Sequence, residues 1–162
     1  AMMVPFTVEM NTLYQKFITE WLRENLPERY EINQGEEEKE EREEETVRLT
    51  EFAGEDIKYK IDMVLYDQVR NEPIAVIDAK YKDHERPGTG DISQMVGYAK
   101  AAGTGDTFLL YPSGLDESLD IQLDDVRVRN RIFRLDGDLD ANGHQFLVDL
   151  AEALDEPELV PA

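Results

Sequence analysis

Two short apolar stretches, Ile61-Asp62-Met63-Val64-Leu65-Tyr66 and Ala75-Val76-Ile77-Asp78-Ala79-Lys80, decide the fold of this 162-residue chain. Both are rich in the β-branched and apolar residues that are typical of strands, and each carries one aspartate. The turn residues Asn71-Glu72-Pro73 between them indicate a hairpin. Because side chains alternate along a strand, Asp78 and Lys80 are expected to project from the same face of the sheet.

The polar residues of this hairpin indicate a metal-dependent reaction. Asp62 and Asp78 are suitable ligands for Mg²⁺ or Mn²⁺, and the backbone carbonyl of Ala79 offers a further oxygen. Lys80 would place a positive charge where an anion develops. A carboxylate directly after Val76-Ile77 is costly to bury unless it is paired or bound to a metal. The combination is suited to phosphodiester hydrolysis.

Simpler roles are open for the same residues. Asp62 can be a strand-end aspartate that pairs with Lys58 or Lys60, and Lys80 can be a plain ion-pair partner of Asp78. A contact between Asp78 and Lys80 does not separate the two interpretations, because it is also expected in the metal-free state of a catalytic site.

Further motifs carry a resemblance to a known family. Ile61-Asp62 with Asp78-Ala79-Lys80 resembles the PD-(D/E)xK nuclease motif, with Ile where that family often has Pro. Gln94-Met95-Val96-Gly97-Tyr98 adds a QxxxY element, and Leu109-Leu110-Tyr111-Pro112 follows it. Over roughly residues 10 to 113, the chain is similar to the nuclease domain of McrC, the cleavage subunit of modification-dependent restriction systems.

The resemblance implies an α/β, restriction-endonuclease-like core, with a central mixed sheet of four or five strands flanked by helices. It also implies a DNA endonuclease that depends on Mg²⁺ or Mn²⁺, held by Asp62, Asp78 and the Ala79 carbonyl. Lys80 would assist the nucleophile. The remaining catalytic residues would be Gln94 and Tyr98, one helical turn apart and opposite the stripe Ile92, Met95, Val96 and Ala99, where they would shape the phosphate site.

This sequence departs from the family pattern at the first helix. The family carries a metal-directed glutamate there, and the matching position in Met10-Asn11-Thr12-Leu13-Tyr14-Gln15 is Gln15. No residue of this helix is therefore an obvious third carboxylate ligand, and Glu9 or Glu20 would have to take the place of the family's glutamate.

The expected partners follow from the same resemblance. McrC-like proteins engage a nucleotide-hydrolysing motor partner through an N-terminal region, and this sequence has no room for one, so we expect a stand-alone nuclease or a fragment. Nucleases of this kind often cut as dimers, which predicts a homodimer. DNA phosphates could be contacted by Lys82 and by a stripe of Arg127, Arg129 and Arg131 on one strand face. Plain surface exposure of Lys82 and pairing of the arginines with carboxylates are equally open.

The net charge of −20 conflicts with nucleic-acid binding, because phosphates are bound by basic surfaces. Either the partner is not nucleic acid, or the chain is adapted to molar salt, where charge repulsion is screened and a carboxylate shell stays hydrated. Acidic residues are spread along the chain, and lysine is scarce, with seven residues against ten arginines. These features favour an extreme halophile.

Composition excludes several other classes. The chain has no cysteine, so disulfides and Cys-based zinc sites are impossible. It also has no apolar run long enough to span a bilayer, which predicts a cytoplasmic protein with no membrane partner.

The chain is expected to form one domain over residues 1–162, with a core at about 10–154. Residues 36–45 contain eight glutamates and are interpreted as a solvated loop, hairpin, strand or helix, with a DNA-mimicking segment as the alternative. Residues 155–162 are expected to be a frayed tail. Asp138-x-Asp140-x-Asn142-Gly143 approximates a calcium loop, but a polar turn into the last helix is the simpler interpretation. The predicted helices are 10–25, with Asn11 or Thr12 as its cap, 91–102, with Asp91 in the N-cap position and Gly103 at its end, and 145–154. The predicted strands are 46–52, 58–66, 74–81, 107–111 and 126–135.

Two other functions remain open at this point. A catalytically idle nuclease fold used as a binding or assembly module is favoured by the charge of −20 and by Gln15, and opposed by the intact set of Asp62, Asp78 and Lys80. A metal-dependent phosphoesterase that acts on a small substrate is the third hypothesis.

Overall fold

Strand β5 (Glu72–Ala79) is the centre of the architecture, because its last six residues are all buried. A strand that is covered on both faces reads as a continuous apolar run, and Ile74-Ala75-Val76-Ile77 is such a run. The computed structural model describes residues 3–33, 48–52, 55–58, 63–81 and 87–162. Within this part, β5 pairs antiparallel with β4 (Met63–Asp67) and parallel with β6 (Asp106–Tyr111).

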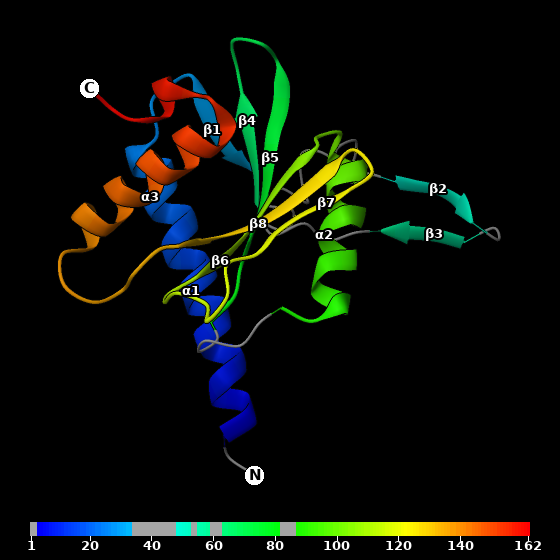
Figure 1. Ribbon diagram of the computed structural model, residues 1–162, viewed down its shortest axis with the longest axis horizontal. Coiled ribbons are helices and arrows are strands. Elements are labelled where there is room, and N and C mark those ends of the chain that lie inside the picture. Colours follow the sequence, from blue (N-terminus) through cyan, green and yellow to red (C-terminus); the bar gives the residue numbers. More distant parts are fainter. Residues whose placement is uncertain (1–2, 34–47, 53–54, 59–62, 82–86) are drawn as a thin grey trace.

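In the part of the chain that the structure describes, the main sheet has six strands in the order β1-β4-β5-β6-β8-β7. The edge strands are β1 (Tyr30–Asn33) and β7 (Asp120–Leu123), and β8 (Val126–Ile132) lies between β6 and β7. A separate antiparallel pair is formed by β2 (Arg48–Phe52) and β3 (Glu55–Lys58), at the right of Figure 1. The predicted α/β class is confirmed. The predicted four or five strands are too few, because the edge strands β1 and β7 are only four residues long, too short for their alternation to stand out in the sequence.

Helices cover both faces of the sheet (Figure 1). Helices α1 (Met3–Asn25) and α3 (Leu139–Leu154) lie on one face, where they form a core cluster with Ala75, Ile77 and Phe108. Helix α2 (Thr89–Ala102) lies on the other face, with Val76, Leu109 and Tyr111 in its own cluster. The two clusters are called the α1/α3 cluster and the α2 cluster below.

All three helices begin earlier than predicted, and α3 starts at Leu139 rather than at residue 145. Helix α1 starts at Met3 rather than at Asn11 or Thr12, and Pro5 is tolerated there because the first helical turn needs no backbone N–H partner. Asn11 instead accepts a hydrogen bond from the backbone N–H of Tyr81 at 2.7 Å, which joins α1 to the chain beyond β5. Helix α2 starts at Thr89, so Asp91 is its third residue and not its N-cap. The predicted end at Gly103 is confirmed, with a left-handed φ of 84°.

The calcium-like pattern is the start of α3. Asp138 is the N-cap, and its Oδ1 accepts hydrogen bonds from the backbone N–H groups of Asp140 and Ala141 at 3.0 and 3.1 Å. Gly143 is needed for packing, because an added Cβ would lie 2.2 Å from the ring of Trp21. The interpretation as a polar turn into the last helix is therefore confirmed.

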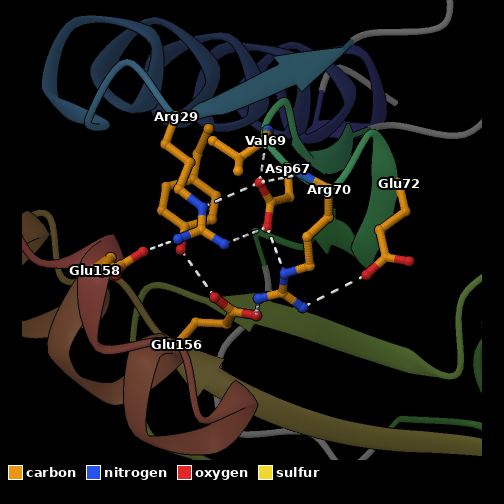
Figure 2. A network of polar contacts seen from close by, with 8 residues as sticks. Arg29, Asp67, Val69, Arg70, Glu72, Glu156 and Glu158 are labelled. Atoms are coloured by element: carbon orange, nitrogen blue, oxygen red, sulfur yellow. Dashed lines mark hydrogen bonds and ion pairs between the residues drawn. The ribbon is translucent and has the colours of Figure 1, made fainter.

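The predicted frayed tail is wrong, because the C-terminal segment is anchored by charge (Figure 2). Asp67, at the end of β4, is fully buried. Its Oδ1 and Oδ2 atoms accept hydrogen bonds from the Arg29 guanidinium at 3.1 and 2.9 Å, and Arg70 Nε lies 2.9 Å from Oδ2. Arg70 also pairs with Glu156, which accepts a hydrogen bond from Tyr30 at 2.8 Å. Beyond Glu156, a short 3-10 helix, η1 (Pro157–Leu159), buries Leu159 completely in the α1/α3 cluster.

Within the described residues, no helix is both long enough and apolar enough to cross a membrane.

The Asp67 network yields a prediction about stability. Hydrogen bonding to Arg29 is the main reason that the pKa of Asp67 is lowered to about 2. Asp67→Asn should lower the free energy of unfolding by about 2 kcal/mol in urea titrations at neutral pH, because it removes the buried anion that holds Arg29 and Arg70 together. Since the folded-state pKa is depressed, this contribution is present above the ordinary carboxyl pKa of about 4 and is lost as the pH falls toward 2.

Glu72→Gln is the matched control, because Glu72 is exposed and pairs with the same Arg70 at 3.4 Å. It should change stability by less than about 1 kcal/mol. Equal effects of the two substitutions would contradict the anchoring role of Asp67.

Candidate active site

Asp78 lies at the carboxyl end of β5, on the face that α2 covers. Its Cα is opposite that of Leu109 in β6, a residue of the α2 cluster. Only 4 % of Asp78 is exposed. Its Oδ2 atom is buried and makes no well-aligned hydrogen bond to the described residues. A carboxylate in this position needs a cation, because burial of an uncompensated charge is strongly unfavourable.

Lys80 supplies that cation. The backbone N–H of Lys80 donates to the carbonyl of Leu110 at 2.8 Å, so the chain still follows β6 after β5 has ended. Its side chain turns back along the same face, and Nζ lies 2.9 Å from Asp78 Oδ2. The same Nζ lies 3.4 Å from Oδ1 of Asp91 at the start of α2. The predicted common face of Asp78 and Lys80 is confirmed.

The electrostatics of the pair favour the charged ammonium. Burial lowers the pKa of Lys80, but the attraction of the Asp78 charge, reinforced by that of Asp91, outweighs burial and raises the pKa above its ordinary value. The same charges also affect the pKa of Tyr111, at the end of β6. Burial is the main cause that raises the pKa of Tyr111 to about 12, and the carboxylates of Asp91 and Asp78 add to it while Lys80 opposes them. Lys80 and Tyr111 therefore stay protonated at neutral pH.

The predicted metal ligands are only partly within the described residues. Asp78 and Ala79 are described, and Ala79 is buried. Asp62 lies outside the described residues, immediately before Met63, whose Cα is opposite that of Ile77. In the described part of the chain, no group of three or more Asp, Glu or His side chains could hold a metal ion. The three-member ligand set therefore remains a prediction.

Gln94 and Tyr98 lie in different surroundings on α2. Gln94 is exposed, whereas Tyr98 is 7 % exposed and belongs to the α2 cluster with Met95 and Ala99. The prediction that Tyr98 lies opposite that apolar stripe is wrong, because its ring is part of the packing between α2 and the sheet. Asp91, Gln94 and Tyr98 are spaced i, i+3 and i+7, so they follow one line along the helix from the Lys80 contact.

Gln15 lies on the side of α1 that faces the chain segment after Lys80. It is half-buried and lies one turn after Asn11, whose side chain binds the backbone of Tyr81 directly after Lys80. The residue at position 15 is thus on the side of α1 that meets the chain beyond β5. Lys82 and the acidic segment 36–45 lie outside the described residues.

The arginine stripe lies on the other face of the sheet. Arg129 is buried, contacts Asp106 at 2.7 Å and the Ala153 carbonyl at 3.1 Å, and stacks over Phe108 in the α1/α3 cluster. Arg127 is exposed and makes two hydrogen bonds to Asp120, both at 2.8 Å. Arg131 donates to the Asn130 carbonyl and lies over the Phe108 ring. The alternative of carboxylate pairing therefore describes Arg127 and Arg129.

Asp91 is the residue that sequence reasoning missed at this site. It was assigned to helix capping, and it does accept a hydrogen bond from the backbone N–H of Gly88 at 3.2 Å. Its other oxygen faces Lys80. The available signal was the spacing of Asp91 to Gln94 and Tyr98, which places all three on one side of the helix.

The fold and the site define a class of protein. A mixed sheet with helices on both faces, and an Asp-x-Lys pair at the carboxyl end of its central strand, form a restriction-endonuclease-like core. The family model described as "McrBC 5-methylcytosine restriction system component" matches residues 2–112, and the chain belongs to this family. The match ends just after β6 and therefore includes Asp78, Lys80 and Asp91. No curated protein matches the chain in sequence.

The structure of the arginine stripe gives a second prediction. Arg129→Met should lower the free energy of unfolding by about 2 kcal/mol, because it removes a buried partner of Asp106 and of the Ala153 carbonyl. Arg127→Met, which removes an exposed pair on the same strand, should lower the free energy of unfolding far less. Thermal or urea unfolding measures both. If Arg129→Met weakened duplex DNA binding with no loss of stability, the stripe would be a phosphate contact and the structural role would be refuted.

Proposed function

We propose that this protein is a divalent-metal-dependent DNA endonuclease that acts within a restriction system. The observation that carries the proposal is the ion pair between the buried Asp78 and Lys80 at the carboxyl end of β5, with Nζ and Oδ2 2.9 Å apart. Family membership supplies the restriction context. The nuclease activity, the metal and the roles of individual residues are inferences from the chemistry of the site.

The residues present fit a hard divalent cation. Asp78 Oδ2 is a buried carboxylate oxygen without a well-aligned hydrogen bond to the described residues, and such an atom is available as a ligand. We assign the remaining protein oxygens to the Ala79 carbonyl and to Asp62, because Mg²⁺ and Mn²⁺ prefer oxygen donors and keep several waters. A bound cation supplies Lewis-acid stabilisation of the negative charge that develops on the phosphate.

The chain's own residues have separate tasks in this proposal. Lys80 provides a protonated ammonium beside Asp78. This ammonium orients the attacking water and stabilises the negative charge that develops on the phosphate. Tyr98 and Gln94 continue from Asp91 along α2. Gln94 is exposed, so its carboxamide can hold a phosphate oxygen of the substrate, and Tyr98 packs α2 against the sheet beside the site.

The substrate and partners follow from the family. A component of a 5-methylcytosine restriction system is expected to act on DNA, together with a nucleotide-hydrolysing motor subunit. A homodimer would bring two such sites to the two strands of a duplex.

The charge of −20 is compatible with this function only if it is screened. We propose that the protein works in molar salt, where the screening length falls from about 10 Å at 0.1 M to about 3 Å at 1 M. Counterion release contributes little to DNA binding at such ionic strength, so a basic surface has less value.

The competing function is that of an idle nuclease fold used as an assembly module. It is favoured by Gln15, which stands where the family has a metal-directed carboxylate, and by the carboxylate pairing of Arg127 and Arg129. It predicts that the Asp78–Lys80 pair is purely structural.

A third prediction separates these functions. In molar KCl, Asp78→Asn should abolish calorimetrically detected Mn²⁺ binding and slow plasmid nicking at least about 100-fold, because it removes the buried anion of the site but keeps its volume. Asp125→Asn is the matched control. Asp125 lies between β7 and β8, and its carboxylate is 4.0 Å from Lys100 in the last turn of α2, at the end of the helix away from Asp78. Wild-type nicking rates in Asp78→Asn would refute the catalytic assignment. A wild-type protein without metal binding would favour the assembly module.

A fourth prediction concerns salt. The thermal unfolding midpoint should rise steeply between 0.1 M and 2 M KCl, because screening relieves the repulsion among 37 acidic residues opposed by only 17 basic ones. Circular dichroism at each salt concentration measures it. Equal midpoints at the two concentrations would leave salt adaptation without support.

A further inference from the structure

We infer that Asp91 is a positioning residue that receives the Lys80 ammonium when a divalent cation binds to Asp78. This inference rests on the proposed function, because it concerns the same metal site. The observation behind it is that one ammonium lies between two carboxylates, 2.9 Å from Asp78 Oδ2 and 3.4 Å from Asp91 Oδ1.

The two cations compete for one atom. Lys80 is paired with the buried Oδ2 of Asp78, the oxygen that we assign to the metal. An ammonium and a divalent cation repel each other, so Lys80 must leave Oδ2 when the metal arrives. If no second anion were within reach, this displacement would leave a largely buried ammonium unpaired, at a high cost in free energy.

Asp91 is built to accept the displaced ammonium. One of its oxygens, Oδ2, accepts the backbone N–H of Gly88 at 3.2 Å, which fixes the carboxylate in the first turn of α2. The other oxygen, Oδ1, faces Lys80. The helix N-terminus further stabilises the negative charge. Because an ammonium has three donors, Lys80 can move toward Asp91 with a small rotation and stay near Asp78.

The arrangement ties the position of Lys80 to the occupancy of the metal site. Without metal, Lys80 neutralises Asp78 and keeps a buried carboxylate tolerable. With metal, Asp91 keeps the ammonium paired, protonated and close to the phosphate. Asp91 thereby lowers the free-energy cost of metal binding without being a ligand.

The test uses Asp91→Asn, whose side-chain oxygen still accepts the Gly88 N–H but carries no charge. Calorimetric titration of Mn²⁺ in molar KCl should give a dissociation constant about tenfold weaker than that of the wild type, which corresponds to a coupling of about 1.4 kcal/mol. Asp125→Asn, which removes the same charge at the other end of α2, should bind Mn²⁺ within about twofold of the wild type.

A second background distinguishes positioning from a direct effect of the charge. In Lys80→Met, no ammonium has to be displaced, so adding Asp91→Asn should change the Mn²⁺ dissociation constant by less than about twofold. A tenfold loss in that background would mean that Asp91 acts directly on the metal, and it would overturn the inference. Equal Mn²⁺ affinity of Asp91→Asn and the wild type would also overturn it and would leave the proposed function intact. If the wild type bound no Mn²⁺, both would fall.

Discussion

The structure depends on how one carboxylate is accommodated at the end of a strand that is buried on both faces. Strand β5 is covered by α1 and α3 on one side and by α2 on the other, and Asp78 sits where this cover ends. Its charge is tolerated because Lys80, two residues further on, returns to the same face at 2.9 Å. The alternation of side chains along β5, its parallel pairing with β6 and the position of the α2 N-terminus all serve this contact.

The same protein uses charge in two distinct ways. Around Asp67, two guanidinium groups and two backbone N–H groups satisfy a fully buried carboxylate, and the result is a rigid anchor for the C-terminal segment. Around Asp78, the described residues supply one close cation, Lys80, and they make no well-aligned hydrogen bond to the carboxylate oxygen Oδ2. A saturated site resists change, whereas an under-coordinated one can exchange its ammonium for another cation. This contrast makes Asp78 the better candidate for chemistry.

Sequence reasoning reached those features that local chemistry determines. Strand β5, the common face of Asp78 and Lys80 and the stop at Gly103 follow from apolar runs, alternation and glycine conformation, and these predictions are confirmed. The strand predicted over 58–66 is only partly right, because β4 spans Met63–Asp67 and Lys58 ends β3 in the separate pair. The edge strands were missed because β1 and β7 are four residues each and β7 is mostly exposed. The anchored C-terminus was missed because Glu156 meets Arg70 over 86 positions, a contact that no local pattern encodes. Asp91 was missed because capping already explained it.

The proposed function depends on the exchange of Lys80 for a divalent cation at Asp78. Anomalous diffraction from crystals grown with Mn²⁺ in molar KCl tests it most directly, because the anomalous signal locates manganese independently of any assumed ligand. We expect a manganese peak at the Asp78 carboxylate, with Lys80 Nζ moved from Asp78 to Asp91. Manganese bound only to exposed carboxylates, with the Asp78–Lys80 contact unchanged at 2.9 Å, would contradict it.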